Sequence, residues 1–526
     1  MSPSFGPRRA DWIVVDTPDP RPGDERLIES LTAYDLLYRS LVAVMFNFAQ
    51  SGHPGGSVSS GRIVESLLFD RMDYDLGDPT RLDQDLMSYA AGHKALGLYA
   101  MLGLRTEVVA ASRPGLVPDA VNHKMRFEDM LGFRRNPTHP TPLFREFGSK
   151  PLDGHPTPAT PFVKLATGAS GIGMGSSLGL AYAAADHFGP DAPRVHIIEG
   201  EGGLTPGRVA EAVAFAATGG LANAVVHLDW NQASIDSDAV TREGAVPGDY
   251  VQWDPMEFFY LQDWNVVEVP DGFDYGLVLA AQRKALEFGN GQPTAVVYRT
   301  VKGWRYGIEG KKSHGAGHKL CSAEYRAAME PLLGEGAPGL PVCEPDAAPD
   351  TVEATFWETL LMLRGLIFER PEMTDTLAGA VADARDRLEL AGRRPRPGAG
   401  DVEAIFAAAE PGEEPADVRL APGDKIALRQ QLGKVLGHLN QSSGGAIVVG
   451  AADLLGSTAI SMVSDGFPGG FYHSTENPGS RTLSVGGICE DGMSCILSGI
   501  SAFGAHVGAG ASYGAFLAPL GHIPSR

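Results

Sequence analysis

Four short apolar runs, separated by glycine-rich turns, limit most strongly what this chain can fold into. They are Val195–Ile198, Ala224–Leu228, Val266–Val269 and Ala295–Tyr298. Each run is rich in β-branched residues and nearly unbroken by polar ones, which is typical of strands buried on both faces of a parallel sheet. A helical pattern over Val209–Thr218 lies between the first two runs and completes a βαβ unit. The sequence therefore predicts an α/β fold, with parallel sheets and helices on both of their faces.

Size and charge limit the number of domains and the kinds of partner. A chain of 526 residues is too long for one ordinary domain and indicates two or three. Asp and Glu together number 64 against 43 Lys and Arg, which gives a net charge of −21. Such an acidic chain is poorly suited to binding nucleic acid or an anionic membrane, and we expect neither partner. A phosphorylated small molecule would need positive potential or a metal ion supplied locally.

Cysteine usage and hydropathy bear on the compartment. The four cysteines have no metal-ligand spacing and are too few for a disulfide framework, which predicts a reducing, cytoplasmic compartment. They are Cys321, Cys343, Cys489 and Cys495. Residues 1–23 lack the apolar core of a signal peptide. The uncharged stretch Met493–Leu520 is long enough to span a bilayer but is crowded with Gly, Ser and Ala, so we expect a buried helix, a loop and a second helix there.

Composition divides the chain into four segments. They are an N-terminal extension (1–25), a first α/β block (26–333), a connector (334–423) and a second α/β block (424–526). The connector holds two helical patterns, Val352–Glu369 and Thr374–Ala391, between stretches rich in Pro, Gly and acids. The second block opens with a helical pattern over Lys425–Leu439, followed by strands at Ala446–Val449 and Thr482–Val485. Because so few strands follow, we expect this block to leave apolar faces uncovered.

A carboxylate and an amide follow two neighbouring strands of the predicted sheet. Glu201 lies in Gly200-Glu201-Gly202-Gly203 after the first apolar run, and Asn231 follows the second run. Ligands of open parallel sheets bind at these strand ends. Carboxylate and amide oxygens suit Mg²⁺, which commonly shares the phosphates of a substrate, and the glycines allow a phosphate to approach the backbone. The alternative is an ordinary glycine turn next to an asparagine turn.

A glycine-rich loop and four histidines add to this pattern. The loop Gly168–Gly175 leads into a helical pattern over Ser176–Asp186, so it predicts either an anion site at a helix N-terminus or close helix packing. The histidines, His53, His93, His155 and His314, each adjoin a glycine in a predicted loop. Four of them in similar settings indicate a polar pocket that binds hydroxyl groups and moves protons.

In their order along the chain, these motifs resemble transketolase, a thiamine-diphosphate-dependent family. The resemblance rests on Ser51–Gly55, Gly92-His93, Gly154-His155, Gly168–Gly173, Gly200-x-Gly followed by Asn231, and His314-Gly315. The second block resembles the start of the pyrimidine-binding domain through Gly450–Leu454 with Ser457, Gly487–Met493 and Ser512–Phe516. The resemblance covers most of residues 30–320 and 425–526. It implies a thiamine-diphosphate-binding fold, with a complete diphosphate-binding domain and a truncated pyrimidine-binding domain.

The resemblance also implies a role for each site residue. Glu201, Asn231 and the carbonyl of Ala233 would hold Mg²⁺, or Ca²⁺ or Mn²⁺ in its place. The cofactor would contact Gly168, Gly171, Gly202, His93, His155, Glu211, Asn231, Glu490, Tyr513 and Phe516. His53, His155, His314, Arg429 and Ser457 would bind the substrate. Catalysis would fall to Glu490, His53, His93 and His314, with a buried Glu490 of raised pKa and histidines of near-neutral pKa.

The activity implied is transfer of a two-carbon ketol unit from a ketose or ketose phosphate to an aldose acceptor. Glu201 stands where the family usually has Asp, and Pro206 replaces an acid of the same motif, although Glu211 is retained. Two alternatives stay open: a subunit of another thiamine-diphosphate-dependent acyl or 2-oxo acid transferase or decarboxylase, and a non-catalytic cofactor-binding scaffold. The four histidines favour ketol transfer, because a 2-oxo acid offers fewer hydroxyl groups to bind.

The resemblance finally implies a partner. The rest of the pyrimidine domain and the C-terminal domain of the family have no counterpart before the chain stops at Arg526. We therefore expect a split enzyme, in which a second polypeptide supplies both parts and two copies of each subunit assemble as a dimer of heterodimers.

Overall fold

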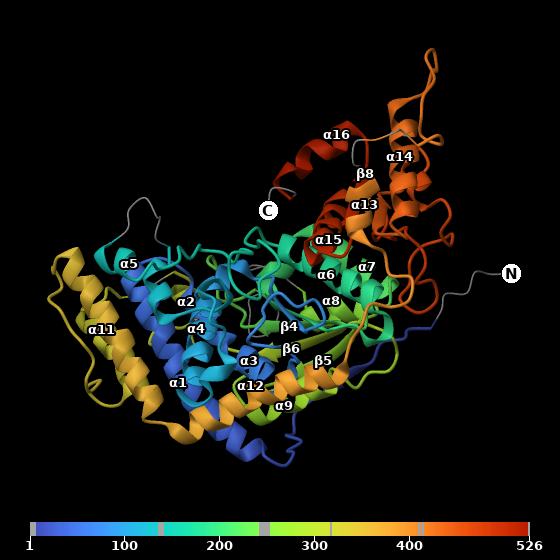
Figure 1. Cartoon of the computed structure of the whole chain (residues 1–526). Coiled ribbons are helices and arrows are strands. Elements are labelled where there is room, and N and C mark those ends of the chain that lie inside the picture. Colours follow the sequence, from blue (N-terminus) through green and yellow to red (C-terminus); the bar gives the residue numbers. More distant parts are fainter. Residues whose placement is uncertain are drawn as a thin grey trace.

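The computed structural model describes residues 7–134, 141–240, 253–315, 318–408, 412 and 415–523. Its centre is a six-stranded parallel sheet in the order β1-β5-β6-β4-β3-β2 (Figure 1). The strands are β1 Trp12–Val14, β2 Leu86–Tyr89, β3 Val195–Gly200, β4 Ala224–Trp230, β5 Asn265–Val269 and β6 Thr294–Arg299. All four apolar runs of the sequence are strands of this sheet, so the predicted α/β class with a parallel sheet is confirmed.

Alternate residues along each strand face opposite layers of helices, as the twofold repeat of a strand requires. Val226 of β4 lies in an apolar cluster with helices α6, α7 and α8, whereas Val225 lies in a cluster with α3 and α9. The helices of the first block are α1 Asp24–Ala49, α2 Pro54–Ser59, α3 Gly61–Ser66, α4 Ala95–Ser112, α5 Pro142–Glu146, α6 Ile172–Phe188, α7 Gly207–Thr218, α8 Pro255–Leu261, α9 Tyr275–Lys284 and α10 Ala323–Leu333. Helices thus cover both faces of the sheet, as predicted.

Both ends of the sheet differ from expectation. The strand β1 lies within the segment that we expected to be an N-terminal extension, and it pairs with β5 from Trp12↔Val266 onwards. The strand β2 pairs with β3 and was not foreseen. Both strands have only three or four residues, too few for an alternating or continuous apolar pattern to stand out.

The connector packs on the first block. Its helices are α11 Pro349–Phe368, α12 Pro371–Ala391 and α13 Val402–Ala408, and the first two correspond to the two predicted helical patterns. Both α11 and α12 pack against α1 and α4, and in Figure 1 they run along the outside of the first block. Their buried residues, such as Phe356 and Leu377, belong to the same apolar cluster as Leu41 of α1.

The second block has a small sheet of two parallel strands, β7 Ile447–Ala451 and β8 Val507–Ala511. Its helices are α14 Leu428–Ser442, α15 Glu490–Phe503 and α16 Gly514–Leu517. The strand predicted at Thr482–Val485 is only a single bridge between Val449 and Thr482, because Leu483 and Val485 pack against the layer of α6 and α7 instead of extending a ladder.

The long uncharged stretch forms a helix, a strand and a short helix, so the loop predicted between the helices is wrong. A strand forms where we expected a loop because glycine residues allow β8 to lie directly on α15. A Cβ atom on Gly508 would lie 2.4 Å from the carbonyl oxygen of Leu497, and one on Gly510 would lie 2.9 Å from the Leu497 side chain. No helix in the described ranges is long and apolar enough to cross a membrane.

The two blocks meet where α6 packs on α15. A Cβ atom on Gly179 would lie 2.1 Å from the carbonyl oxygen of Ile496, and one on Gly499 only 1.8 Å from that of Ser176. Gly175, the last glycine of the loop Gly168–Gly175, also lies against α15, because a Cβ atom on it would be 2.6 Å from the Cβ atom of Cys495. Close helix packing, one of the two roles predicted for this loop, therefore applies at its C-terminal end. At the end of α6 the buried Asp186 accepts hydrogen bonds from Arg481 and His506. Burial alone would raise the pKa of Asp186, but these bonds lower it below its ordinary value.

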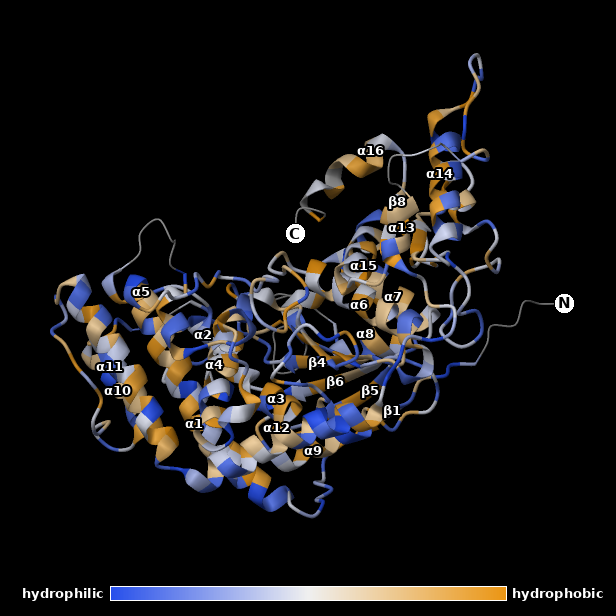
Figure 2. Cartoon of the chain, viewed as in Figure 1, coloured by the Kyte–Doolittle hydropathy of each residue, from blue (hydrophilic) through white to orange (hydrophobic). Residues whose placement is uncertain are grey.

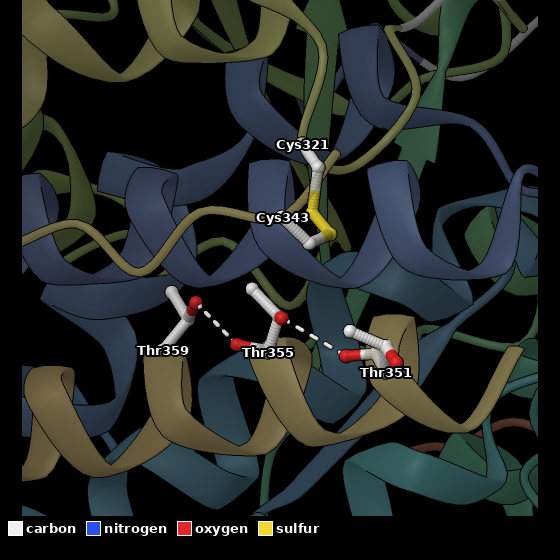
Figure 3. Close-up of a disulfide and its surroundings, with 5 residues drawn as sticks. All are labelled: Cys321, Cys343, Thr351, Thr355 and Thr359. Carbon is white, nitrogen blue, oxygen red and sulfur yellow. Dashed lines mark hydrogen bonds between the residues drawn. A yellow bond between two sulfur atoms is a disulfide. The ribbon is translucent and has the colours of Figure 1, made fainter. Parts of the chain in front are cut away.

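The cysteines do not behave as expected, because Cys321 and Cys343 form a disulfide with a Cα–Cα distance of 5.1 Å (Figure 3). The 22-residue separation includes α10 and the irregular segment that follows it, which returns the chain to Cys321. Figure 3 shows the bond above α11, whose Thr355 and Thr359 hydroxyls donate to carbonyl oxygens one turn earlier. Cys489 and Cys495 are buried free thiols.

A buried row of hydrogen-bonding side chains crosses three strands of the main sheet. His196 Nδ1 lies 3.0 Å from His227 Nε2, and His227 Nδ1 lies 2.9 Å from the Tyr298 hydroxyl. Burial lowers the pKa of His196 to about 3 and that of His227 well below its ordinary value. Both rings are therefore neutral in the native protein.

This row predicts how stability depends on pH. Between pH 7 and pH 5 the unfolded chain binds a proton at His196 that the native protein does not, so the free energy of unfolding should fall by about 2 kcal/mol for this residue alone. His196→Gln should show a correspondingly smaller loss between these pH values in urea unfolding. His123→Gln, at a half-buried position in a 3₁₀ turn, is the control, and a slope unchanged by His196→Gln would refute the assignment.

Candidate active site

The carboxyl ends of β3 and β4 bring Glu201 and Asn231 together. Glu201 begins the 3₁₀ turn Glu201–Leu204 directly after β3, and its Oε2 accepts a hydrogen bond of 3.4 Å from the backbone N–H of Asn231. Glu201 is only 2% exposed, and its Oε1 has no partner among the described residues. Burial, and then the nearby Asp229, raise the pKa of Glu201 to about 7. The turn thus holds a buried carboxylate oxygen ready for a cation.

Asn231 is oriented by a buried aspartate. Its Nδ2 donates to Asp229 Oδ2 over 3.1 Å, and its Oδ1 accepts from the N–H of Ala233 over 3.1 Å. Asp229 also accepts from the Ser59 hydroxyl and from Lys94 Nζ, which lies 2.8 Å away. These hydrogen bonds fix the side-chain amide of Asn231, and its Oδ1 therefore points toward Ala233.

Lys302 is a site residue that the sequence reasoning missed. It follows β6, is 5% exposed, and places Nζ 2.9 Å from His314 Nδ1 and 3.3 Å from the carbonyl oxygen of Ala233. Burial lowers the pKa of Lys302 to about 8, despite the nearby Glu201. This lysine and Lys94 supply positive charge at one edge of a strongly acidic chain. Its position in the sequence could have identified Lys302 as a site residue, because it lies just beyond the end of a buried strand and in the segment that leads to His314.

Three of the four predicted histidines form one cluster. The ring of His53 lies 4.5 Å from that of His314 and 5.6 Å from that of His93, and His53 Nδ1 is 2.9 Å from the carbonyl oxygen of His314. Burial lowers the pKa of all three, that of His93 well below its ordinary value and that of His314 to about 4. The expected near-neutral pKa is therefore wrong, because these rings are desolvated and lie beside lysines. They are neutral hydrogen-bonding groups at pH 7.

The glycine-rich loop lies against His155 and Gly92. Gly168 and Gly171 have positive φ angles of 137° and 83°, and Gly171 caps the N-terminus of α6. A Cβ atom on Gly168 would lie 2.7 Å from the His155 ring, so only glycine fits there. A Cβ atom on Gly202, in contrast, would have no neighbour within 4 Å, and this glycine is exposed next to Glu201. The loop and Gly202 thus leave backbone accessible beside the buried carboxylate.

The predicted residues of the second block lie together but make no contact with this edge in the described residues. Glu490 opens α15, is partly exposed rather than buried as expected, and accepts a 3.0 Å hydrogen bond from Ser512. Tyr513 and Phe516 are neighbours with ring centroids 6.3 Å apart and are about half exposed. Their exposure follows from the position of α16, which projects from the edge of the molecule in Figure 1.

The remaining predicted residues have different surroundings. Glu211 of α7 accepts a 2.7 Å hydrogen bond from the backbone N–H of Gly492, so it contacts the first turn of α15. Arg429 and Ser457 are exposed, and neither makes a hydrogen bond or ion pair with the histidines where the chain is described. The structure therefore does not bring these two residues to the histidine cluster.

The oxygen set of Glu201, Asn231 and Ala233 is compatible with a hard cation. The Glu201 oxygen without a partner supplies the charge, and the amide and carbonyl oxygens are the other ligand types that Mg²⁺ accepts. No group of three or more His, Cys, Asp or Glu side chains suited to a metal occurs in the described ranges, and this set, with one carboxylate, is of a different kind. Further ligands would have to come from a bound phosphate or from water.

Part of this chain is similar in sequence to known transketolases. Residues 128–332 match the family described as transketolase, thiamine diphosphate binding domain. Transketolase of Pongo abelii is 31% identical over 296 residues, which cover 56% of this chain and 40% of that protein. Transketolase-like protein 2 of Bos taurus is 31% identical over 256 residues, covering 48% and 34%. The matched regions thus span less than half the length of these curated relatives.

Solved structures show the same fold. Transketolase from Leishmania mexicana superposes with a TM-score of 0.65 at 22% identity, covering 94% of this chain and 66% of that one. Transketolase from Campylobacter jejuni gives 0.64 at 22% identity, covering 94% and 67%. The similarity in fold therefore extends beyond the first block into the second.

Proposed function

We propose that this chain is a member of the transketolase family and is the thiamine-diphosphate- and Mg²⁺-binding subunit of an enzyme that transfers a two-carbon ketol unit. The donor would be a ketose or ketose phosphate and the acceptor an aldose, in the cytoplasm. The observation that carries the proposal is the pairing of Glu201 with Asn231 at adjacent strand ends, beside the exposed backbone of Gly202.

The first block would hold the diphosphate end of the cofactor. Glu201, Asn231 and the carbonyl of Ala233 would bind the metal ion, and the glycine loop would approach the phosphate oxygens. Lys302, which now donates to Ala233, would add a positive charge near the phosphates. When bound, thiamine diphosphate supplies a carbon nucleophile and an electron sink, and the protein contributes binding, orientation and proton transfer.

The histidine cluster would hold the sugar. Its three neutral rings offer both donors and acceptors, with ring centroids 4.5–6.3 Å apart, and His155 lies against Gly168 of the glycine loop. A polyhydroxylated donor or acceptor satisfies more of these nitrogens than a 2-oxo acid does. The cluster therefore supports ketol transfer over transfer from a 2-oxo acid.

The cofactor held by one copy of the chain would be contacted by Glu490, Tyr513 and Phe516 of another copy. Within one chain, these three residues make no described contact with the sheet edge that carries the metal ligands. In this arrangement the two aromatic rings would pack on the pyrimidine ring, and Glu490 would share a proton with one of its nitrogens. Their partial exposure supports this role, because each side chain has a free face for a ligand.

A second polypeptide would complete the second block, in a dimer of heterodimers. The strand β8 pairs with β7 alone among the described strands, which leaves a sheet edge available for a further strand. Apolar side chains are exposed nearby, including Leu517, and Leu428 of α14 is 87% exposed. Figure 2 shows hydrophobic residues along both α14 and α16.

Calorimetric titration tests the cofactor proposal. The full chain, together with its partner where one is required for solubility, should bind thiamine diphosphate in the presence of Mg²⁺ and much more weakly with EDTA. Product formation is then measured with a ketose phosphate or a 2-oxo acid as donor. Binding without turnover of either donor would favour a scaffold subunit, and absence of binding would overturn the proposal.

A further inference from the structure

A cavity of about 780 Å³ lies at the opposite edge of the main sheet from the candidate active site. Helix α12 of the connector and the start of α1 form its walls, together with the residue that precedes β3. Arg194 stands directly before β3 and Glu201 directly after it, so the two sites are separated by the strand length, about 20 Å. We call this space the connector cavity. It has the size of an ordinary small-molecule site.

Charged side chains dominate its lining. Five arginines and five aspartates line it: Arg26, Arg71, Arg113, Arg194, Arg387, Asp24, Asp70, Asp73, Asp375 and Asp383. The formal charges of these ten side chains cancel. The arginines and the aspartates differ, however, in how many of them already have an ion-pair partner in the protein. That difference decides which kind of ligand the cavity suits.

Three of the five carboxylates are largely neutralised by the protein itself, whereas Asp375, which accepts a hydrogen bond from the Ser112 hydroxyl, and Asp383 make no ion pair within the described part of the chain. Arg283, outside the lining, makes ion pairs with both Asp24 and Asp70. Asp73 pairs with Arg387 at 2.7 Å and lies 3.8 Å from Arg393, which is also outside the lining. Wall carboxylates held in this way by arginines contribute little negative potential to the cavity.

Three lining arginines remain unpaired. Arg26, Arg113 and Arg194 make no ion pair within the described part of the chain, and they come from α1, the end of α4 and the start of β3. The guanidinium of Arg113 lies over α12, since its Nη2 would be 3.5 Å from a Cβ atom on Gly379. Three arginines without an ion pair line one cavity from three elements and outnumber its two unpaired aspartates, Asp375 and Asp383. They suit an anion with two negative charges, because each guanidinium can donate two parallel hydrogen bonds.

The backbone next to the cavity is also unusual. Residues Leu67–Arg71 form a single π-helical turn, and three of them, Phe69, Asp70 and Arg71, line the cavity. Single π turns within helical segments are found frequently at functional sites. No glycine or proline in this segment accounts for the wider turn.

We propose that the connector cavity binds a small doubly charged oxyanion, a phosphate ester or a dicarboxylate, through Arg26, Arg113 and Arg194. Such a ligand would bridge α12 and the first block from within. The site is separate from the proposed cofactor site and does not depend on the proposed function.

The test uses the full chain, titrated calorimetrically with inorganic phosphate and, separately, with succinate, both with and without an excess of thiamine diphosphate and Mg²⁺. The double variant Arg113→Gln/Arg194→Gln should weaken binding at least about tenfold. Arg385→Gln removes a partly exposed arginine of α12 outside the cavity and should bind as the parent does. Melting temperatures of both variants check folding.

The outcomes separate the possibilities. Binding of phosphate alone would identify a phosphate ester as the natural class, and binding of both probes would identify dianion geometry as the determinant. Equal phosphate affinity in parent and double variant would place the anion elsewhere and overturn the proposal. Absence of binding of either probe up to about 10 mM would do the same.

Discussion

Replacement of Glu490 by glutamine should remove nearly all turnover of the assembled enzyme and leave cofactor affinity close to that of the parent. Glutamine keeps the size of the side chain and can still accept the 3.0 Å hydrogen bond from Ser512. It cannot exchange a proton with a nitrogen of the cofactor at neutral pH. Loss of proton transfer by one positioned group costs about 10²–10⁴-fold in rate, and kcat should fall by this amount with little change in KM.

Glu476→Gln is the matched control, because Glu476 is an exposed acid of the same block without a proposed role. Its kcat should equal that of the parent. Calorimetry on both variants verifies that thiamine diphosphate still binds. A Glu490→Gln enzyme with near-normal kcat would remove Glu490 from the mechanism, and the proposed contribution of the second block to catalysis with it.

Local sequence patterns predicted the interior of the fold well. Apolar runs such as Ala224–Leu228 became strands because their burial on both faces leaves no room for polar residues. The predicted pairing of Glu201 with Asn231 needed only the rule that parallel strands end at the same edge. These features depend on neighbouring residues along one strand or on two strands joined by one helix.

Other features depend on contacts between distant segments, which local patterns do not encode. The disulfide of Cys321 with Cys343 depends on the course of α10, and the strand β8 depends on the glycines that let it lie against Leu497. The lowered pKa of His314 depends on burial and on Lys302, twelve residues earlier in the chain. A residue's charge state in such a site follows from what surrounds it in space, which a motif does not specify.

Replacement of Glu201 by alanine should weaken Mg²⁺-dependent binding of thiamine diphosphate about 100-fold, or about 2.7 kcal/mol. The only carboxylate of the proposed ligand set would be lost, while the amide of Asn231 and the carbonyl of Ala233 would remain. Calorimetry with and without EDTA measures the metal-dependent part directly. Glu201→Asp, which restores the residue usual in the family, should bind within about tenfold of the parent.

The melting temperature of the Glu201→Ala variant distinguishes a metal-binding role of Glu201 from a structural one. Glu201 Oε1 is buried without a donor among the described residues, the carboxylate lies near the charge of Asp229, and its one hydrogen bond from Asn231 is long at 3.4 Å. Removing the carboxylate should therefore leave the melting temperature of the cofactor-free protein nearly unchanged or raise it. A residue needed for folding would show the reverse. If Glu201→Ala melts several degrees lower and binds the cofactor as tightly as before, Glu201 supports the turn after β3 and does not hold a metal ion.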